Sequence, residues 1–259
     1  MKLKLYQIDA FASKVFEGNP AAVCPLEEWL DDSVMQNIAM ENNLAETAFF
    51  VKSGEEYDIR WFTPNKEVNL CGHATLASAY VIFNILGEVN QSITFNSKSG
   101  PLHVHKNKEL ITMNFPAEPP ILCDTPQAII DAFEKEPVEV LKSVDYIVVF
   151  DDYEDLEKLS PNLELLKSLD LRGVSITSKD KKYDFVSRFF APNYAIDEDS
   201  VTGSAYTQLV PYWSNKLQKK SLYSKQVSAR GGELNCEMKI DRVYISGTAV
   251  SYLKAEIEI

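Results

Sequence analysis

The chain has 259 residues, of which 45% are hydrophobic and 25% are charged, and its formal net charge is −12 at pH 7. These proportions are those of an ordinary globular protein. The excess of negative charge argues against a nucleic-acid partner, because such a surface repels a phosphate backbone.

The cysteines and the apolar segments further limit the class of protein to which this chain can belong. The four cysteines are scattered with no CxxC spacing, which argues against a disulfide framework and against a structural zinc site. The longest apolar stretch, residues 76–86, is interrupted by Ser78 and Asn84 and is too short to span a membrane. Residues 1–9 alternate like a strand and lack the apolar core of a signal peptide. We therefore expect a cytoplasmic protein with reduced thiols, no membrane contact and no bound metal.

Hydrophobic periodicity predicts two similar series of strands and helices. In chain order, the first series is a strand at 3–9, a turn at 16–20, a helix at 30–42, strands at 47–51 and 57–61, a buried helix at 74–86 and strands within 102–115. Residues 116–120 (PAEPP) form a stiff connector. The second series has a helix from 204 towards 216, with a kink or early end at Pro211, and strands within 234–245. This pattern predicts an α+β fold of two lobes, each with strands wrapped about one buried helix.

Two segments of the chain, about half its length apart, read as copies of one another. Residues 60–65 (RWFTPN) match 188–193 (RFFAPN), 70–74 (LCGHA) match 201–205 (VTGSA), and 99–102 (SGPL) match 231–234 (GGEL). Three matches in the same order at nearly constant offset indicate a duplicated chain. We place an N-terminal lobe at 1–115 and a C-terminal lobe at 116–259, with the final strand able to return to the first lobe. The groove between two such lobes is the expected small-molecule site.

Each copy contains a glycine, Gly72 or Gly203, directly before a predicted helix. Backbone amides at a helix N-terminus lack helical partners and favour a bound anion. A glycine needed only for close packing is the structural alternative, and it stays open for each turn alone. Neither glycine belongs to a GxGxxG or Walker pattern, so we expect no nucleotide cofactor.

The copies differ at the residue after each glycine, which is His73 in the first and Ser204 in the second. His73 can act as an acid, a base or a hydrogen-bond donor near neutral pH. Its place beside a glycine turn makes it a better candidate than His103 or His105, which lie at alternate positions of a predicted strand. Ser204 can donate to a substrate carboxylate or simply cap its helix.

Asp199 is the carboxylate nearest the second glycine turn, at the end of the acidic run 197–199. Clustered carboxylates repel an anionic ligand unless one of them contacts a cationic or hydroxyl group. We select Asp199 for that contact, and a helix N-cap is the structural alternative.

Glu46 is a carboxylate that enters an apolar strand 14 residues before Arg60. The same step back from Arg188 falls on Val174, so the two copies differ here by a carboxylate against a valine. A partly buried carboxylate can both take and return a proton, which predicts an asymmetric site. An ion pair with Arg60 is the structural alternative.

These residues together resemble the PhzF-like phenazine biosynthesis family, which consists of cofactor-free isomerases in the diaminopimelate-epimerase-like fold. The matching motifs cover nearly the whole chain: 9–11 (DAF), 16–23 (FEGNPAAV), 43–47 (NLAET), 60–64 (RWFTP), 67–68 (EV), 70–75 (LCGHAT), 198–199 (ED), 201–205 (VTGSA) and 230–232 (RGG). The resemblance implies two pseudo-symmetric lobes, each a β-sheet rolled into a barrel around a central helix, with the site between them. It also implies a homodimer.

The resemblance further implies a role for each candidate residue. The family's catalytic glutamate falls on Glu46, which would serve as general base and then general acid. In the best-known members it moves a proton between carbons of an unsaturated cyclic amino acid. The family's histidine, aspartate and serine fall on His73, Asp199 and Ser204, and the groups implied to hold a small carboxylate substrate are Gly72, Gly203 and Asn19.

Two residues depart from the family pattern. Ser200 stands where members usually have proline, and Ala195 stands where they usually have glycine. Both changes alter loop rigidity or backbone freedom near Asp199 and leave the catalytic residue types intact. The substrate therefore stays open, and the phenazine reaction itself is not implied.

Three other functions remain as alternatives. An amino-acid racemase of the two-cysteine kind needs a second thiol opposite Cys71, and the second copy offers only Val201, Thr202 and Ser204. A cysteine hydrolase would use Cys71 and His73, whose side chains need not meet at a helix start. A non-catalytic ligand-binding protein would keep the groove without the chemistry.

Overall fold

The computed structural model describes the whole chain apart from the side chain of Asp155. The chain forms two compact units, the first made of Met1–Asn114 and Ser246–Ile259 and the second of Phe115–Ile245. The chain passes from the first unit to the second within β8 (Leu110–Pro116) and returns within β17 (Arg242–Gly247). The predicted α+β class is confirmed, since each unit combines one β-sheet with a few helices.

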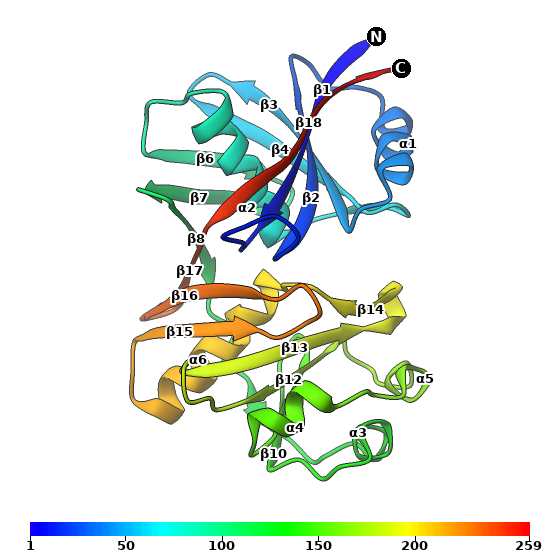
Figure 1. Ribbon diagram of the computed structural model, residues 1–259, viewed down its shortest axis with the longest axis vertical. Helices are drawn as coiled ribbons and strands as arrows, with labels where there is room; N and C mark the ends of the chain where they lie inside the picture. The colour runs from blue at the N-terminus through cyan, green and yellow to red at the C-terminus, as the bar shows by residue number, and fades with distance from the viewer. The chain divides into compact units, whose positions relative to one another are not determined.

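The first unit is a sheet in the order β18–β1–β2–β3–β4–β6–β7–β8, parallel at β2–β3 and at β4–β6. Its terminal strands lie side by side, with Lys2 opposite Glu258 (Figure 1). The elements are β1 (Lys2–Ala10), β2 (Asn19–Leu26), α1 (Asp32–Asn42), β3 (Glu46–Ser53), β4 (Glu56–Phe62), β5 (Glu67–Val68), α2 (Gly72–Tyr80), a π-helix (Val81–Ile85), β6 (Ser92–Ser97), β7 (Gly100–Asn107), β8 and β18 (Ala249–Glu258).

The second unit is a sheet in the order β9–β10–β11–β12–β13–β15–β16, parallel at β11–β12 and at β13–β15. The elements are β9 (Ile121–Leu122), α3 (Gln127–Phe133), β10 (Glu139–Lys142), β11 (Tyr146–Val149), α4 (Tyr153–Lys158), α5 (Leu163–Leu166), β12 (Val174–Ser178), β13 (Phe185–Ala191), a 3-10 helix (Pro192–Tyr194), β14 (Ile196–Asp199), a second 3-10 helix (Gly203–Ala205), α6 (Tyr206–Leu217), β15 (Ser221–Gln226), β16 (Gly232–Lys239) and β17.

The duplication read in the sequence recurs in the strand pairing. The series β1–β2–β3–β4–β6–β7 pairs antiparallel, parallel, antiparallel, parallel and antiparallel. The series β10–β11–β12–β13–β15–β16 pairs in the same way and order. The short strands β5 and β14 add antiparallel to β4 and β13 at equivalent points. Each unit is thus one copy of the same folding pattern.

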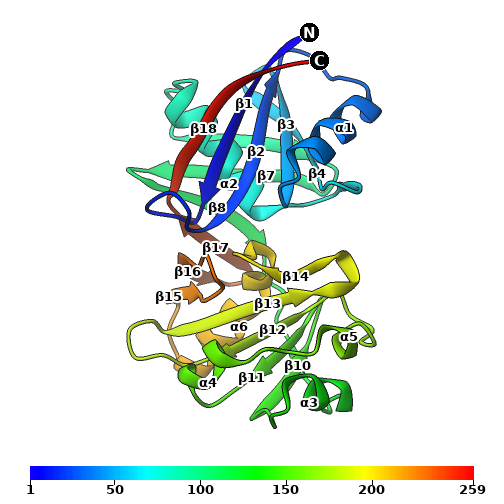
Figure 2. The same ribbon diagram turned by 45° about the vertical axis from the view of Figure 1, so that its right-hand side comes forward.

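Each unit contains one buried helix. Every residue of α2 from Gly72 to Ala79 is buried, and the helix packs against β1, β2 and β3 (Figure 2). In the second unit, α6 is buried from Tyr206 to Trp213 and packs against β15 and β16. The helix continues through Pro211 to Leu217, so the early end predicted at this proline is wrong. Burial of the surrounding turns outweighs the one backbone hydrogen bond that proline cannot donate.

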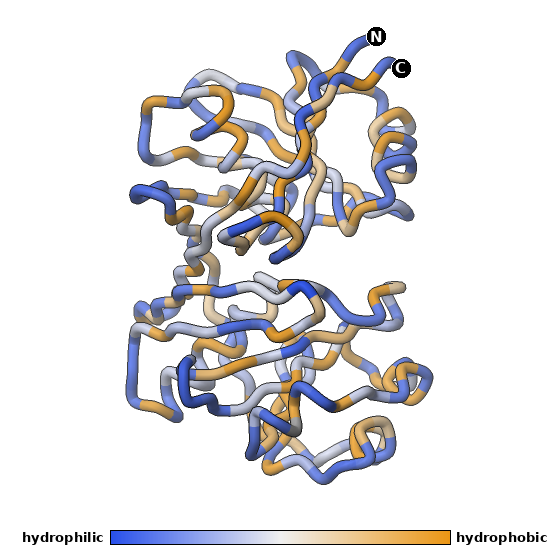
Figure 3. The backbone as a smooth tube through the Cα atoms, viewed as in Figure 1, coloured by the Kyte–Doolittle hydropathy of each residue, from blue (hydrophilic) through white to orange (hydrophobic). Residues whose placement is uncertain are grey.

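The remaining helices cover the outer faces of the sheets. In the first unit, Met35, Ile38 and Ala39 of α1 pack in one apolar cluster with Phe49 and Phe62. In the second, α3, α4 and α5 contribute to a larger cluster around Phe133 and Phe190. Apolar and polar residues alternate in short stretches along the chain (Figure 3). No helix of the described residues has the length and apolar character needed to cross a membrane.

Candidate active site

Three of the predicted residues meet at one edge of the first unit. Asn19 begins β2, Glu46 begins β3, and His73 is the second residue of α2. Because β2 and β3 are parallel neighbours, with Ala21 opposite Glu46, both strands present their first residues at the same edge of the sheet. The buried start of α2 brings His73 to that edge as well.

His73 is the centre of this group. Its Nε2 lies 3.0 Å from Oε2 of Glu46, and its Nδ1 lies 3.2 Å from the side-chain amide nitrogen of Asn19. The sulfur of Cys71 lies 3.6 Å from the same Nδ1, so the two side chains at this helix start do meet. A rotation of the Asn19 amide exchanges its donor for its acceptor, so Asn19 can hold the ring in either protonation state.

The proton on His73 is held by its neighbours. Burial lowers the pKa of His73, but Cys71 and Glu46 raise it, and the pKa lies well above its ordinary value. Burial and the charge of Glu46 raise the pKa of Cys71 to about 11, so this thiol is uncharged at neutral pH. The carboxylate of Glu46 is therefore the charge that keeps His73 protonated there.

The carboxylate of Glu46 is only partly engaged. Its Oε2 lies within ion-pair distance of His73 but accepts no well-directed hydrogen bond from the described residues. The side chain is 12% exposed. Arg60 does not contact it, since that guanidinium donates to Glu67 and Asp32 instead. The alternative reading of Glu46 as the ion-pair partner of Arg60 is therefore wrong.

Glu46, Cys71 and His73 each offer a donor atom to a metal ion, and these atoms lie within 4.8 Å of one another. A metal there would have to displace the protons of His73 and Cys71, whose pKa values are both raised. A metal ion would therefore compete with protons for this group at neutral pH.

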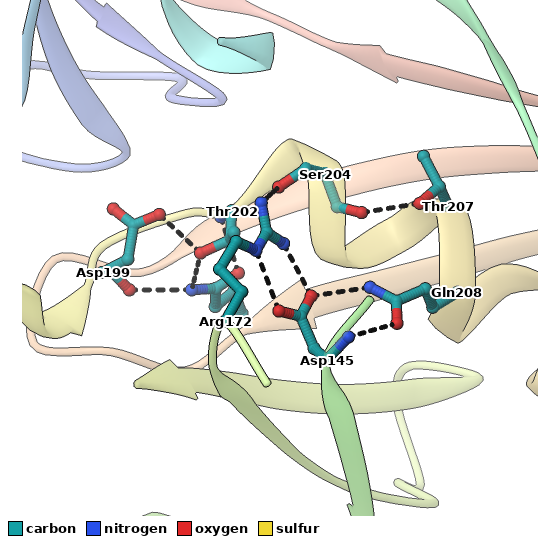
Figure 4. A network of polar contacts seen from close by, with 8 residues as sticks. Asp145, Arg172, Asp199, Thr202, Ser204, Thr207 and Gln208 are labelled. Carbon is teal, nitrogen blue, oxygen red and sulfur yellow. Dashed lines mark hydrogen bonds and ion pairs between the residues drawn. The ribbon is translucent and has the colours of Figure 1, made fainter. Parts of the chain in front are cut away.

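Asp199 and Ser204 lie in the second unit, at the end of β14 and in the 3-10 turn before α6. The carboxylate of Asp199 accepts a hydrogen bond of 2.5 Å from Thr202. The hydroxyl of Ser204 accepts one of 3.0 Å from Arg172 (Figure 4). Gly203 is buried at the start of this turn, and the α-helix itself begins three residues later, at Tyr206.

Sequence reasoning missed Arg172 and its partner Asp145. Both oxygens of Asp145 accept from Arg172, at 2.8 and 2.6 Å, and the Asp145 side chain is fully buried. The side-chain amide of Gln208 donates to the same carboxylate at 2.6 Å. The signal that could have pointed to Arg172 is its place immediately before the second-copy position that matches Glu46.

That matching position is Gly173 and not Val174. Phe62 lies opposite Thr47, and its counterpart Phe190 lies opposite Val174. Thr47 thus corresponds to Val174, and the residue before it, Glu46, corresponds to Gly173. Counting back from the arginines failed because the turn between the paired strands is one residue longer in the second copy. A Cβ on Gly173 would lie 2.6 Å from the Phe189 ring and 2.7 Å from the Phe190 carbonyl oxygen, so no side chain fits there.

Two other features of the repeat lie outside this chemistry. Arg60 clamps Glu67 in the first unit, and Arg188 clamps Glu198 in the second, each through two hydrogen bonds. These pairs fix the approach to each glycine turn. His103 and His105, the weaker histidine candidates, are exposed and contact Thr94 and Ser92.

Comparisons with known proteins place the chain among close relatives. The sequence profile of the family described as phenazine biosynthesis-like protein (PhzC-PhzF) matches residues 8–255. An uncharacterized isomerase of Pseudomonas aeruginosa is 47% identical over 259 residues, with 100% of both chains covered. The crystal structure of a PhzF-family phenazine biosynthesis protein from Enterococcus faecalis superposes with a TM-score of 0.98 at 46% identity, over 100% of both chains. A hydroxyproline epimerase from Agrobacterium vitis, at 9% identity, shares the fold alone, with a TM-score of 0.65 over 99% of this chain and 92% of that chain.

Proposed function

Since the chain belongs to the phenazine biosynthesis-like protein family and is an isomerase, we propose that it moves a proton between two carbons of a small carboxylate or cyclic amino-acid-like substrate without a cofactor. Glu46 is the general base and then the general acid of this reaction. The phenazine reaction itself is not part of the proposal.

The observation that supports this proposal is the state of Glu46. Its Oε2 is buried, accepts no well-directed hydrogen bond from the described residues, and faces a protonated histidine at 3.0 Å. The positive ring attracts the carboxylate of Glu46, and the oxygen that lacks a hydrogen bond can accept a proton. A carboxylate held in this way is suited to take a proton from carbon and give it back.

The reaction follows from these groups. Glu46 takes a proton from a substrate carbon, the C–H bond breaks, and its electron pair moves into the conjugated system next to the substrate carboxylate. Glu46, now neutral, returns the proton to a different carbon, so atoms and electrons balance without an oxidant or reductant. His73 stabilises the charged form of Glu46 at the start and end, and Asn19 fixes the orientation of the His73 ring.

The remaining predicted residues bind the substrate. We expect the backbone amides of Gly72 and Gly203 to hold its carboxylate, as amides at helix starts do. Ser204 donates a hydrogen bond to the substrate, and Asp199 binds a cationic or hydroxyl group of the substrate. We further expect the substrate to be held by residues of both halves of the chain, and the protein to be a cytoplasmic homodimer, which light scattering after size-exclusion chromatography would test.

The experiment is solvent-deuterium incorporation. The protein is incubated in deuterium oxide with a panel of cyclic amino acids and unsaturated carboxylates, and each recovered compound is analysed by mass spectrometry and proton NMR. Deuterium at a carbon position supports proton-transfer isomerisation. Its absence across the panel favours a ligand-binding protein.

Variants of the first unit identify the base. Glu46→Gln is expected to lower the rate of deuterium incorporation by about 10²- to 10⁴-fold, the range that a general base supplies. Glu41→Gln, which removes an exposed carboxylate at the end of α1, is the matched control and should retain the rate.

A thiol mechanism is the second candidate, because the sulfur of Cys71 does contact His73. A pKa of about 11 opposes it, since a thiolate base would be scarce at neutral pH. Loss of activity in Cys71→Ala with activity kept in Glu46→Gln would select the thiol and refute the proposed base.

A further inference from the structure

Arg172 occupies the position in the second unit that corresponds to the residue just before Glu46 in the first. In the first unit, Glu46 reaches the residue after the glycine, with 3.0 Å between its Oε2 and Nε2 of His73. In the second, Nη1 of Arg172 lies 3.0 Å from the hydroxyl oxygen of Ser204, again the residue after the glycine. Adjacent positions of the repeat thus carry an anion in one unit and a cation in the other.

The guanidinium of Arg172 is held in place from one side. Its Nε and Nη2 donate to the two oxygens of Asp145, a side chain with no exposed surface. Gln208 donates to the same carboxylate and accepts from the backbone N–H of Asp145 at 3.0 Å. Figure 4 shows the guanidinium between Asp145 and Ser204. The Phe189 ring lies 5.3 Å from its central carbon. A cation fixed by these contacts loses little freedom when it binds a ligand.

Arg172 retains hydrogen-bonding capacity on its other side. A guanidinium has five N–H groups, and three of those of Arg172 donate to Asp145 and Ser204, which leaves two without a hydrogen-bond partner among the described residues. The charges of Asp199 and Glu118 also act on this guanidinium. The side chain is 32% exposed. By contrast, Arg188 makes four hydrogen bonds, to Glu198 and two backbone carbonyls, and is 11% exposed. Arg188 therefore has a structural role, whereas Arg172 is a fixed cation that can still donate hydrogen bonds to a ligand.

We propose that Arg172 is the residue that recognises the substrate's carboxylate, acting together with the hydroxyl of Ser204. Because the Ser204 oxygen accepts from Arg172, its own proton points elsewhere and can be donated to a carboxylate oxygen. Arg172 supplies a second, charge-assisted hydrogen bond to the same group. This proposal rests on the proposed function, since it names what selects an anionic substrate for that reaction.

The test measures carboxylate binding directly. Benzoate and L-proline serve as carboxylate probes, and benzamide and L-prolinamide are their counterparts without the carboxylate. The Nε–H signal of Arg172 in the NMR spectrum, assigned by its loss in Arg172→Lys, is followed during each titration. Both carboxylates are expected to shift this signal, and the amides are expected to leave it unchanged.

Variants give the magnitude of the effect. Arg172→Gln alone would strand the buried charge of Asp145 and endanger folding, so the principal variant is the pair Arg172→Gln with Asp145→Asn, which removes both charges. It is expected to bind both carboxylates about 10- to 100-fold more weakly. Arg172→Lys keeps the positive charge but loses the planar set of guanidinium donors, so its carboxylate affinity should lie between that of the double variant and that of the native protein. Lys216→Gln removes an exposed cation of the same unit and should leave binding unchanged.

Two results would overturn the proposal. One is equal carboxylate affinity in the native protein and the folded double variant. The other is a failure of both benzoate and L-proline to shift the Arg172 signal. Absence of deuterium incorporation would refute the isomerisation proposal and leave this binding result standing.

Discussion

The two glycine turns of this chain share a backbone plan and differ in the chemistry placed beside it. Beside Gly72, the head of the strand carries Glu46, which makes an ion pair with buried His73. Beside Gly203, the equivalent strand is preceded by Arg172, which donates to Ser204. In both units of the duplicated fold, the start of a strand lies close to the start of a helix. The charged side chain at this place is an anion, Glu46, in the first unit and a cation, Arg172, in the second.

Under the two proposals, the two units have separate tasks. A carboxylate held by a protonated ring is suited to proton transfer, whereas a guanidinium beside a hydroxyl is suited to binding an anion. The second unit cannot carry a second base at the equivalent point, because Gly173 has no room for a side chain. The asymmetry is therefore built into the packing of the repeat.

The largest expected effect comes from removing the charge of Asp145, the buried carboxylate that holds Arg172 in the second unit. Asp145→Asn leaves the charge of Arg172 without its buried partner, and we expect the free energy of unfolding to fall by about 3–5 kcal/mol in urea denaturation. Glu67→Gln is the matched change in the first unit, where carboxylate and arginine are 19% and 18% exposed, and it should cost about 1–3 kcal/mol. Equal losses in the two variants would contradict the view that the fully buried carboxylate of Asp145 is the more costly one to neutralise.

The next effect concerns the position that replaces Glu46. Gly173→Ala places a methyl group 2.6 Å from the Phe189 ring, and we expect it to cost about 3 kcal/mol of stability. Gly54→Ala is the control, since that glycine has a positive φ but a methyl group added there would meet nothing within 4 Å, and it should cost about 1 kcal/mol. A Gly173→Ala protein as stable as the native one would show that the second unit can accommodate a side chain there.

Gly173 also marks the limit of what the sequence could predict. The glycine turns, the buried helix after Gly72, the family and the α+β class follow from motifs and periodicity, because these depend on local residue order. The position of the second copy that corresponds to Glu46 cannot be predicted in this way, because one residue inserted in the turn between the paired strands shifts the alignment of the two copies. Arg172 and Asp145 are 27 residues apart and meet only through the pairing of β11 with β12, so no local spacing predicts their contact.

The ion pair of the first unit gives a pH-dependent prediction. The pKa of His73 is raised in the folded protein above the ordinary value of about 6.5, so its stabilisation is complete below that pH. The stabilisation should be lost as pH rises through the raised pKa. Facing groups are Glu46, Asn19 and Cys71, and burial raises the pKa of Cys71 to about 11, so it stays neutral in this range.

The measurement is the free energy of unfolding from pH 6 to 9. Native protein should lose stability over this range relative to Glu46→Gln, because the variant lacks the charge that holds the proton on His73. His103→Gln, at an exposed histidine of the same unit, should follow the native curve. Parallel curves for the native protein and Glu46→Gln would show that Glu46 does not set the protonation of His73.

The smallest effect concerns a turn that the first unit lacks. Arg60 and Glu67 are seven residues apart and Arg188 and Glu198 ten, so three residues are inserted in the second copy, and Ala195 lies in this segment. Its φ is 59°, a left-handed conformation that costs an alanine about 1 kcal/mol. Ala195→Gly removes this strain but gives the unfolded chain more freedom, which offsets about 0.4–1 kcal/mol. We expect a gain of about 0.5 kcal/mol or less, measured as a small rise in Tm. Ala128→Gly, the same change within α3, should lower the Tm, and an equal fall in both variants would show that the turn at Ala195 is not strained.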